Sequence, residues 1–299
     1  MNVLSLFDGI SVARHALGDR VGKYYASEID EKAIEIAKKN FPDTIHTGDV
    51  RTIKAESLPK IDLLIGGSPC QDLSIAQKNR KGLDGERSGL FWEYVRILRE
   101  VKPTYFVLEN VASMSKGAKQ TITEELGVEL VMIDASLVSA QSRKRLFWTN
   151  IPVEGLPADR GILLKDILEP DGEVDERMTM KGKSYCLTAT YKGATAKNTL
   201  ERRQRTMVKI GEKTRKLTPI ECERLQSLPD NYTAGIAMTH RYKCLGNAFN
   251  AEVVKFILSF IPVKTDPKNI IVAEHKKEDD ISAEGGLFGG DEDAARKIN

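Results

Sequence analysis

One cysteine of this chain has the surroundings expected of a nucleophile. The apolar run Ile61–Ile65 continues directly into Gly-Gly-Ser-Pro-Cys-Gln at positions 66–71. The run predicts a buried strand, so Cys70 stands in a polar turn at the carboxyl end of the strand. An accessible thiolate in such a turn can attack an electrophilic carbon, whereas a cysteine used for packing lies more naturally inside a strand. The pattern predicts that Cys70 is catalytic.

Two further motifs place polar side chains at strand ends. Glu109 closes the apolar run that begins at Tyr105, and a carboxylic acid at this rim can serve as a general acid. Arg143 and Arg145 precede another apolar strand, and alternate residues of an extended segment point to the same side. Each motif alone also fits a solvated loop, so their joint appearance is what favours a catalytic site.

A glycine turn near the amino terminus predicts a nucleoside site. Leu-Phe-Asp-Gly-Ile-Ser at positions 6–11 runs from a strand into a turn, and Glu28 stands nineteen residues after Gly9. Rossmann-like sheets hold a nucleoside with such a turn and an acid on the ribose hydroxyls. Only one glycine is present and no P-loop lysine follows, which favours a ligand without a pyrophosphate. An ordinary strand–turn–helix fits the turn equally well.

The elements that must position these residues alternate between strand and helix. Apolar runs at 3–7, 24–27, 61–65, 105–108 and 130–133 are separated by helix-like stretches, one capped by Asp30 and one ending before Pro103. Such alternation predicts an α/β fold with a mostly parallel, Rossmann-like sheet. Ligands of these sheets bind beyond the carboxyl ends of the strands, where the motifs above lie.

The second half of the chain has a different character. Residues 151–214 are rich in Gly, Lys, Arg and Thr, with a strand expected at Tyr185–Tyr191. Helices are expected at Thr218–Ser227, which has a capping-box pattern, and at Ala248–Ile261. Residues 263–299 have the composition of a disordered tail.

The overall composition and charge exclude several classes of protein. The 299 residues are 41% hydrophobic and 29% charged, which is typical of globular proteins. The longest apolar run is too short to span a membrane, and the amino terminus does not resemble a signal peptide. Four cysteines and four histidines form no metal-ligand pattern, so we expect no metal site.

The net charge of +2 is distributed unevenly. Residues 176–216 hold 12 basic and 3 acidic side chains, a local net charge of +9. This excess indicates a polyanionic partner, although a solvated basic face is the alternative.

Taken together, the ordered motifs resemble the family of cytosine-5 DNA methyltransferases, over residues 1–150 and 215–261. The resemblance rests on Pro-Cys-Gln (69–71), Glu-Asn-Val (109–111), Gln-x-Arg-x-Arg (141–145), Arg-Lys-Leu-Thr-Pro (215–219), Glu-Cys-x-Arg-Leu-Gln (221–226) and Leu-Gly-Asn-Ala (245–248). Ser-Pro-Cys-x-Asp-Leu-Ser (68–74) and Gly-Leu-Phe-x-Glu-Tyr (89–94) are similar in particular to the eukaryotic de novo branch. The family usually has Ala-Gly-x-Gly where this chain has Asp8-Gly9-Ile10-Ser11.

The resemblance implies a fold, a reaction and a set of roles. It implies a seven-stranded S-adenosylmethionine-dependent methyltransferase sheet (1–150), a small target-recognition region (151–214) and helices that complete the catalytic domain (215–262). Cys70, Glu109, Arg143 and Arg145 would be catalytic. S-adenosyl-L-methionine would contact Phe7, Asp8, Gly9, Ile10, Ser11, Glu28, Ile29, Asp49, Val50, Pro69, Leu90, Asn247 and Ala248. Double-stranded DNA would contact Gln71, Ser74, Lys78, Arg80, Lys81, Arg87, Gln141, Arg202, Arg203 and Arg205.

Several alternatives stay open at this point. The same chemistry could act on tRNA cytosine, and a homologue that binds DNA without catalysis would share the motifs. The recognised sequence, a restriction partner and the oligomeric state, monomer or otherwise, cannot be read from these residues. The resemblance implies action in the cytoplasm of a prokaryote, either as a host protein or as a phage protein.

Overall fold

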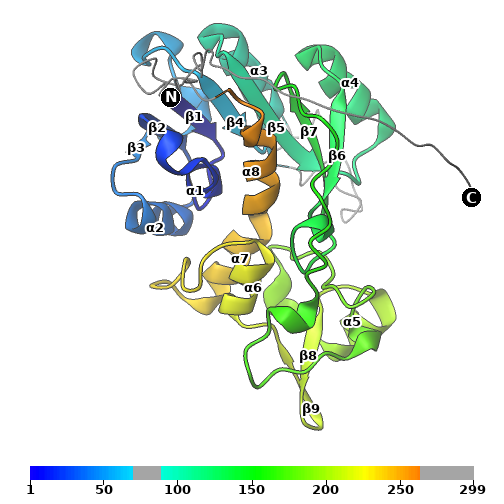
Figure 1. The fold of residues 1–299 in the computed structure, drawn as a ribbon. Helices are drawn as coiled ribbons and strands as arrows, with labels where there is room; N and C mark the ends of the chain where they lie inside the picture. The colour runs from blue at the N-terminus through cyan, green and yellow to red at the C-terminus, as the bar shows by residue number, and fades with distance from the viewer. Residues whose placement is uncertain (70–88, 263–299) are drawn as a thin grey trace, which may run out of the picture. The chain divides into compact units, whose positions relative to one another are not determined.

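A mostly parallel sheet organises the first half of the chain (Figure 1). The structure is a computed structural model and describes residues 1–69 and 89–262, in which seven strands form this sheet in the order β3-β2-β1-β4-β5-β7-β6. Neighbouring strands are parallel as far as β5, whereas β7 is antiparallel to both β5 and β6. The strands are β1 (Asn2–Leu6), β2 (Lys23–Ser27), β3 (Ile45–His46), β4 (Leu63–Gly66), β5 (Tyr105–Val111), β6 (Leu130–Asp134) and β7 (Lys144–Thr149). The predicted α/β sheet is confirmed.

Helices cover both faces of the sheet because successive strand residues point to opposite sides. Val3 of β1 packs in one core with Ile65 and with residues of α1 (Val12–Leu17) and α8 (Ala251–Ser259). Leu4, the next residue, packs in a second core with Trp148 and with residues of α3 (Leu90–Val101) and α4 (Lys116–Leu126). Since both faces are buried, the side chains at the strand ends are the ones left to line a site.

Two local predictions about helix starts are confirmed. Asp30 caps α2 (Glu31–Asn40) by accepting a hydrogen bond from the backbone N–H of Lys32. Thr218 and Glu221 form the expected capping box at the start of α6 (Pro219–Leu225). Both signals depend only on residues within one helical turn, which is why sequence alone reveals them.

The helices that follow α6 differ from the prediction. A helix that was not predicted, α7 (Met238–Asn247), precedes α8, and α8 begins after Asn250 rather than at Ala248. The side chain of Asn250 accepts a hydrogen bond from the backbone N–H of Val253 and so sets the start of α8.

The predicted recognition region, residues 151–214, is built largely from turns. Its regular elements are α5 (Ala196–Arg202) and the antiparallel pair of β8 (Met207–Ile210) with β9 (Lys213–Lys216). The predicted strand at Tyr185–Tyr191 is wrong. Side chains satisfy its backbone instead: Thr206 Oγ1 accepts from the N–H of Tyr185 at 2.9 Å, and Gln141 Oε1 accepts from that of Leu187 at 3.2 Å.

The described residues up to Pro262 belong to one compact unit. Predictions for Cys70, Gln71, Ser74, Lys78, Arg80, Lys81, Arg87 and the tail at 263–299 lie outside the described residues. In the described part of the chain, no helix is long and apolar enough to cross a bilayer.

Candidate active site

A cavity of about 360 Å³ opens at the carboxyl ends of the parallel strands. This volume is within the range of small-molecule sites. Most of the predicted cofactor and catalytic residues that the structure describes line it. They are Phe7, Gly9, Ile10, Glu28, Ile29, Asp49, Val50, Pro69, Leu90, Glu109, Arg143, Arg145, Asn247 and Ala248.

The turn after β1 is held in an unusual backbone conformation. Phe7 and Ser11 have φ angles of 56° and 60°, which non-glycine residues rarely adopt. The buried carboxylate of Asp8 supports the turn by accepting hydrogen bonds from Tyr24 Oη at 2.7 Å and Ser11 Oγ at 2.5 Å. Gly9 has a φ of 60° that its lack of a side chain permits.

Asp8 and Ser11 support the turn without lining the cavity. Neither is among the residues that line the cavity, and both are buried. Burial raises the pKa of Asp8 to about 6, against hydrogen bonds from Ser11, Ser5 and Tyr24 that lower it. Because Asp8 bonds to both Ser11 and Tyr24, these side chains shape the turn, and the predicted contact of Asp8 and Ser11 with S-adenosyl-L-methionine stays a prediction.

Glu28 joins the turn to the following strand end. Its Oε2 accepts a hydrogen bond from the Gly9 N–H, and its Oε1 accepts from the N–H groups of Ile29 and Asp30, each at 2.8 Å. A carboxylate has about four lone-pair sites, so one acceptor position is left for a ligand hydroxyl. Ile29 beside it is 67% exposed and offers an apolar surface at the cavity wall. This combination fits the ribose and base of a nucleoside.

Asp49 lines the same part of the cavity but is already paired. Arg51 Nη2 lies 2.5 Å from Asp49 Oδ2, and this hydrogen bond keeps the pKa of Asp49 below its usual range. The carboxylate is therefore a charged acceptor at the cavity edge. Its predicted contact with S-adenosyl-L-methionine stays a prediction.

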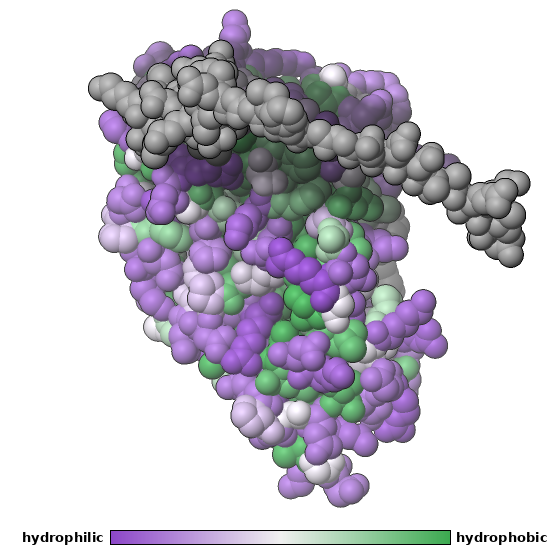
Figure 2. Space-filling model, in the orientation of Figure 1, coloured by the Kyte–Doolittle hydropathy of each residue, from purple (hydrophilic) through white to green (hydrophobic). Residues whose placement is uncertain are grey.

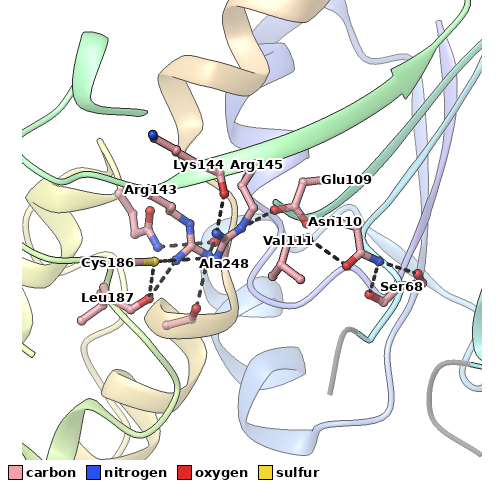
Figure 3. A network of polar contacts seen from close by, with 12 residues as sticks. Ser68, Glu109, Asn110, Val111, Arg143, Lys144, Arg145, Cys186, Leu187 and Ala248 are labelled. Atoms are coloured by element: carbon pink, nitrogen blue, oxygen red, sulfur yellow. Dashed lines mark hydrogen bonds and ion pairs between the residues drawn. The ribbon is translucent and has the colours of Figure 1, made fainter. Parts of the chain in front are cut away.

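The turn that leads to Cys70 is fixed by the neighbouring strand. Asn110 Nδ2 donates to Ser68 Oγ at 3.2 Å (Figure 3), and Asn110 Oδ1 accepts from the N–H of Val111 at 2.8 Å. At Gly67 a Cβ atom would lie 2.9 Å from the Phe249 ring and 3.0 Å from Glu109 Oε2. The backbone thus approaches Glu109 as closely as a glycine allows.

Glu109 and Arg145 form an ion pair at the floor of the cavity. Glu109 ends up opposite Phe147 in the β5–β7 pairing, and Arg145 Nε lies 2.8 Å from Glu109 Oε1 (Figure 3). Both side chains are largely buried. Since Oε1 faces Arg145 and Oε2 faces Gly67, the carboxyl group lies between the guanidinium and the turn that precedes Cys70.

Arg143 is used differently from Arg145. Its Nη1 donates to the carbonyl of Leu187 at 2.8 Å, and its Nη2 donates to those of Ala248 at 2.7 Å and Gly246 at 3.2 Å. The side chain is buried, and burial lowers its pKa, with the Arg145 charge acting in the same direction. Arg143 therefore holds three chain segments together, and its predicted catalytic role stays a prediction.

Gln141, predicted to contact nucleic acid, is 0% exposed. Its Nε2 donates to the Leu225 carbonyl at 2.6 Å and to Gln226 Oε1 at 3.0 Å, in addition to the contact with Leu187. The prediction conflicts with this burial, because the amide is satisfied entirely by protein groups.

The three predicted arginines of the recognition region do not behave alike. Arg202 and Arg203 are exposed at the end of α5. Arg205 is half-buried, and its guanidinium donates to the Gly193 carbonyl at 3.2 Å and to Thr190 Oγ1 at 2.9 Å. Arg202 and Arg203 are thus available to a phosphate backbone, while Arg205 also braces a turn.

Several cavity residues carried no signal in the sequence. Lys243 and Cys244 of α7 line the cavity, and Lys243 Nζ lies 2.6 Å from Asp30 Oδ2 across its wall. Cys186 lies against Arg143, with Sγ 3.4 Å from Nη1. Arg143 and Cys186 are 43 positions apart in the sequence, and Asp30 and Lys243 are 213 apart. No local sequence pattern predicts contacts over such separations.

The chain matches a known family along most of its length. The profile described as C-5 cytosine-specific DNA methylase matches residues 1–155 and 165–262. Over 303 residues the chain is 30% identical to the type II methyltransferase M1.ScrFI of Lactococcus lactis subsp. cremoris, covering 85% of this chain and 76% of that protein. It is 34% identical to the orphan methyltransferase M.SPRI of Bacillus phage SPR, covering 63% of this chain and 47% of that protein.

Solved structures share the fold at lower identity. The Entamoeba histolytica methyltransferase EhMeth superposes with a TM-score of 0.68 at 16% identity, and the S. pombe Dnmt2 methyltransferase with 0.61 at 21%. Each match covers 87% of this chain and 97% of the other. With the profile match and the bacterial relative, these findings lead to one conclusion: the chain belongs to the family of C-5 cytosine-specific DNA methylases.

Proposed function

We propose that this protein transfers a methyl group from S-adenosyl-L-methionine to carbon 5 of a cytosine in duplex DNA. The single observation that carries the proposal is the cavity that a glycine turn, Glu28, the Pro69 end of the Cys70 turn and the Glu109–Arg145 pair line together. Its type II relative is a methyltransferase by name, which supports the reaction class.

The cofactor would occupy the part of the cavity between the two strand-end acids. Glu28 would accept a hydrogen bond from the ribose with its remaining lone pair, while Ile29 and Val50 would cover the base. Phe7, Leu90 and Asn247 would close the methionine end. When bound, the sulfonium group supplies an electrophilic methyl.

The chain itself must make carbon 5 of cytosine nucleophilic. We propose that the Cys70 thiolate adds to carbon 6 of the ring, which turns the ring into an enamine-like nucleophile at carbon 5. Cys70 lies outside the described residues, but it follows Pro69, which lines the cavity. After methyl transfer a base removes the carbon-5 proton and the thiolate is eliminated, which restores the enzyme.

Negative charge that develops on the ring needs a partner. Glu109 Oε2 faces the turn that precedes Cys70, so it would protonate or hydrogen-bond ring nitrogen 3. Arg145 would hold the carboxyl group and the ring carbonyl on the other side. The target cytosine must leave the duplex to reach this cavity.

The recognition region would supply contacts to the DNA backbone. Figure 2 shows hydrophilic side chains over most of the face drawn, with smaller hydrophobic areas in its lower part, where Figure 1 places α5, β8 and β9. Arg202 and Arg203, at the end of α5, are exposed. We further propose the division into 1–150, 151–214 and 215–262, and action in the cytoplasm, as suits bacterial and phage relatives.

A mechanism-based trap tests the proposal. Duplex DNA with 5-fluorocytosine at the target cannot lose fluorine as a cation, so the reaction stalls after methyl transfer. We expect a protein–DNA adduct that survives denaturation and requires S-adenosylmethionine. Cys70→Ala must abolish it, whereas Cys222→Ala, a buried thiol of α6, must leave it intact.

Two controls separate the alternatives. Methyl transfer to duplex DNA is compared with transfer to tRNA; transfer to tRNA alone would overturn the DNA assignment. Truncation after Pro262 removes the tail and should leave methylation within about twofold, because its acidic, Gly-rich composition predicts no folded role. Adduct formation by Cys70→Ala would show that the nucleophile is another residue.

A further inference from the structure

A short piece of the proposed recognition region packs against the two arginines of the site. The segment comprises residues 184–189. Ser184 forms an isolated β-bridge with Gln141, and the carbonyl of Leu187 accepts a hydrogen bond from Arg143. A Cβ atom at Gly246 would lie only 2.1 Å from the Thr188 carbonyl carbon, so the segment packs tightly against the end of α7. The segment is thereby fixed to the catalytic sheet and to the cavity wall at once.

This segment brings a sulfur atom to both guanidinium groups (Figure 3). Cys186 Sγ lies 3.4 Å from Arg143 Nη1 and 3.9 Å from Arg145 Nη2. It also lies 3.5 Å from the Leu187 carbonyl, to which the neutral thiol can donate. The Arg145 guanidinium therefore contacts Glu109 through Nε and Cys186 through Nη2.

The charges around this contact explain why a polarisable acceptor is useful there. Arg143 and Arg145 are two cations in a mostly buried place, and Glu109 is the one carboxylate paired with them among the described residues. Burial alone would raise the pKa of the Cys186 thiol, but the charges of Arg143 and Arg145 outweigh it and lower that pKa. The two guanidinium groups thus favour the ionised form of this thiol more than its burial disfavours it.

From this geometry we propose that Cys186 is a positioning residue, through which the recognition region orients Arg145 and with it the Glu109–Arg145 pair. The proposal rests on the proposed methyl transfer. A guanidinium is planar, so fixing Nε and Nη2 fixes the plane of the whole group. Glu109 is then correctly placed only when residues 184–189 pack in their observed position against Arg145.

Three substitutions distinguish a polar contact from packing. Cys186→Ser keeps an acceptor for Arg145, Cys186→Val keeps apolar volume, and Cys186→Ala keeps neither. If the sulfur acts as an acceptor, the single-turnover rate of methyl transfer falls about tenfold in Ala and Val but less than about threefold in Ser. KM for DNA and for S-adenosylmethionine stays within about twofold, as it does in the control Cys222→Ala. A Val variant that is as active as wild type, with Ser impaired, would overturn the proposal.

A second measurement does not depend on activity. With cysteine labelled at Cβ by ¹³C, NMR follows the titration of each thiol, and the Cys186 signal is assigned by its loss in Cys186→Ala. Its midpoint should rise in Arg145→Gln and stay unchanged in Arg160→Gln, an exposed arginine paired with Glu252. If the titration midpoint of Cys186 is the same in Arg145→Gln as in wild type, the proposed contact is refuted. If wild-type protein methylates nothing while this midpoint still moves, the proposed function fails and the contact stands.

Discussion

The catalytic sheet and the recognition region satisfy their backbone groups by different means. In the sheet, ladders of backbone hydrogen bonds do this work, as in the paired β1 and β4. In the proposed recognition region, side chains contribute as well: Lys183 Nζ donates to the carbonyl of Ile162, and Tyr191 Oη donates to that of Thr206. Several polar side chains of the proposed recognition region are thus occupied by structural hydrogen bonds.

This difference teaches how to interpret the basic stretch at 176–216. Its net charge of +9 suggests a uniform surface for a polyanion. Yet Lys183 is bound to carbonyls, Arg215 is paired with the buried Glu221, and Arg177 is paired with Asp175. A charge excess in a loop-rich region therefore overstates the charge that is available to a partner.

The largest expected effect comes from the sheet. Glu109→Gln removes the proton donor at the strand end and should slow methyl transfer about 100- to 10,000-fold, with cofactor affinity kept. Single-turnover kinetics and isothermal titration measure the two quantities. Glu201→Gln, an exposed acid of α5, is the matched control and should change neither. If both variants lose methyl-transfer rate equally, the proposed functional difference between the sheet and the recognition region is wrong.

Asp8 should make stability depend on pH. Its pKa is 3.8 in the unfolded chain and about 6 when buried, so the folded state binds the proton more tightly. The stabilising contribution is complete below pH 4 and is lost as the pH rises through 6, about 3 kcal/mol in all. Between pH 5 and pH 7.5, urea unfolding of wild type should lose about 1 kcal/mol that Asp8→Asn does not lose. Parallel pH curves for the two proteins would contradict this.

The junction between the regions should be sensitive to a single methyl group. Gly246→Ala places a Cβ against the backbone of Thr188 and Ala189, and overpacking of this kind costs about 1–3 kcal/mol. Denaturant midpoints measure the loss. Gly117→Ala in α4 is the control, since a Cβ there meets nothing within 4 Å and helices prefer Ala. Equal stability of Gly246→Ala and wild type would mean that the junction yields easily.

The smallest effect concerns DNA affinity. Replacing Arg202 and Arg203 together by Gln should reduce the slope of log affinity against log salt by about 2, one phosphate contact each. Arg177→Gln, whose guanidinium is exposed but paired, should leave the slope unchanged. Fluorescence anisotropy at several salt concentrations measures both. A larger change for Arg177 would reverse our distinction between free and occupied charge.

What could be predicted from the sequence follows the same division. The strand ends that hold Glu28, Pro69 and Glu109, and the caps at Asp30 and Thr218, depend on neighbours within a few residues. Period and capping signals are local, so these predictions were accessible.

The structural roles that sequence alone did not reveal for Gln141 and Arg143 depend on contacts that span the chain. Gln141 and Arg143 look like surface polar residues because their partners, Leu225 and Ala248, lie 84 and 105 residues away. The helix α7 was not predicted because Thr239, His240 and Arg241 weaken its apolar periodicity. Only the assembled core, to which Tyr242 and Leu245 contribute, makes that segment helical.

The tight seat of residues 184–189 has a consequence for protein engineering. A chimaera that borrows a foreign recognition region would have to retain this seat, because Leu187 and Thr188 meet Arg143 and Gly246 through backbone atoms. Cut points placed after Tyr191 and before Thr206 would keep both of these buried residues, which bond to each other, to Tyr185 and to Leu217, and would exchange residues 192–205. Such an exchange would alter the DNA sequence preference of the enzyme and would leave residues 184–189, which contact the proposed catalytic arginines, unchanged.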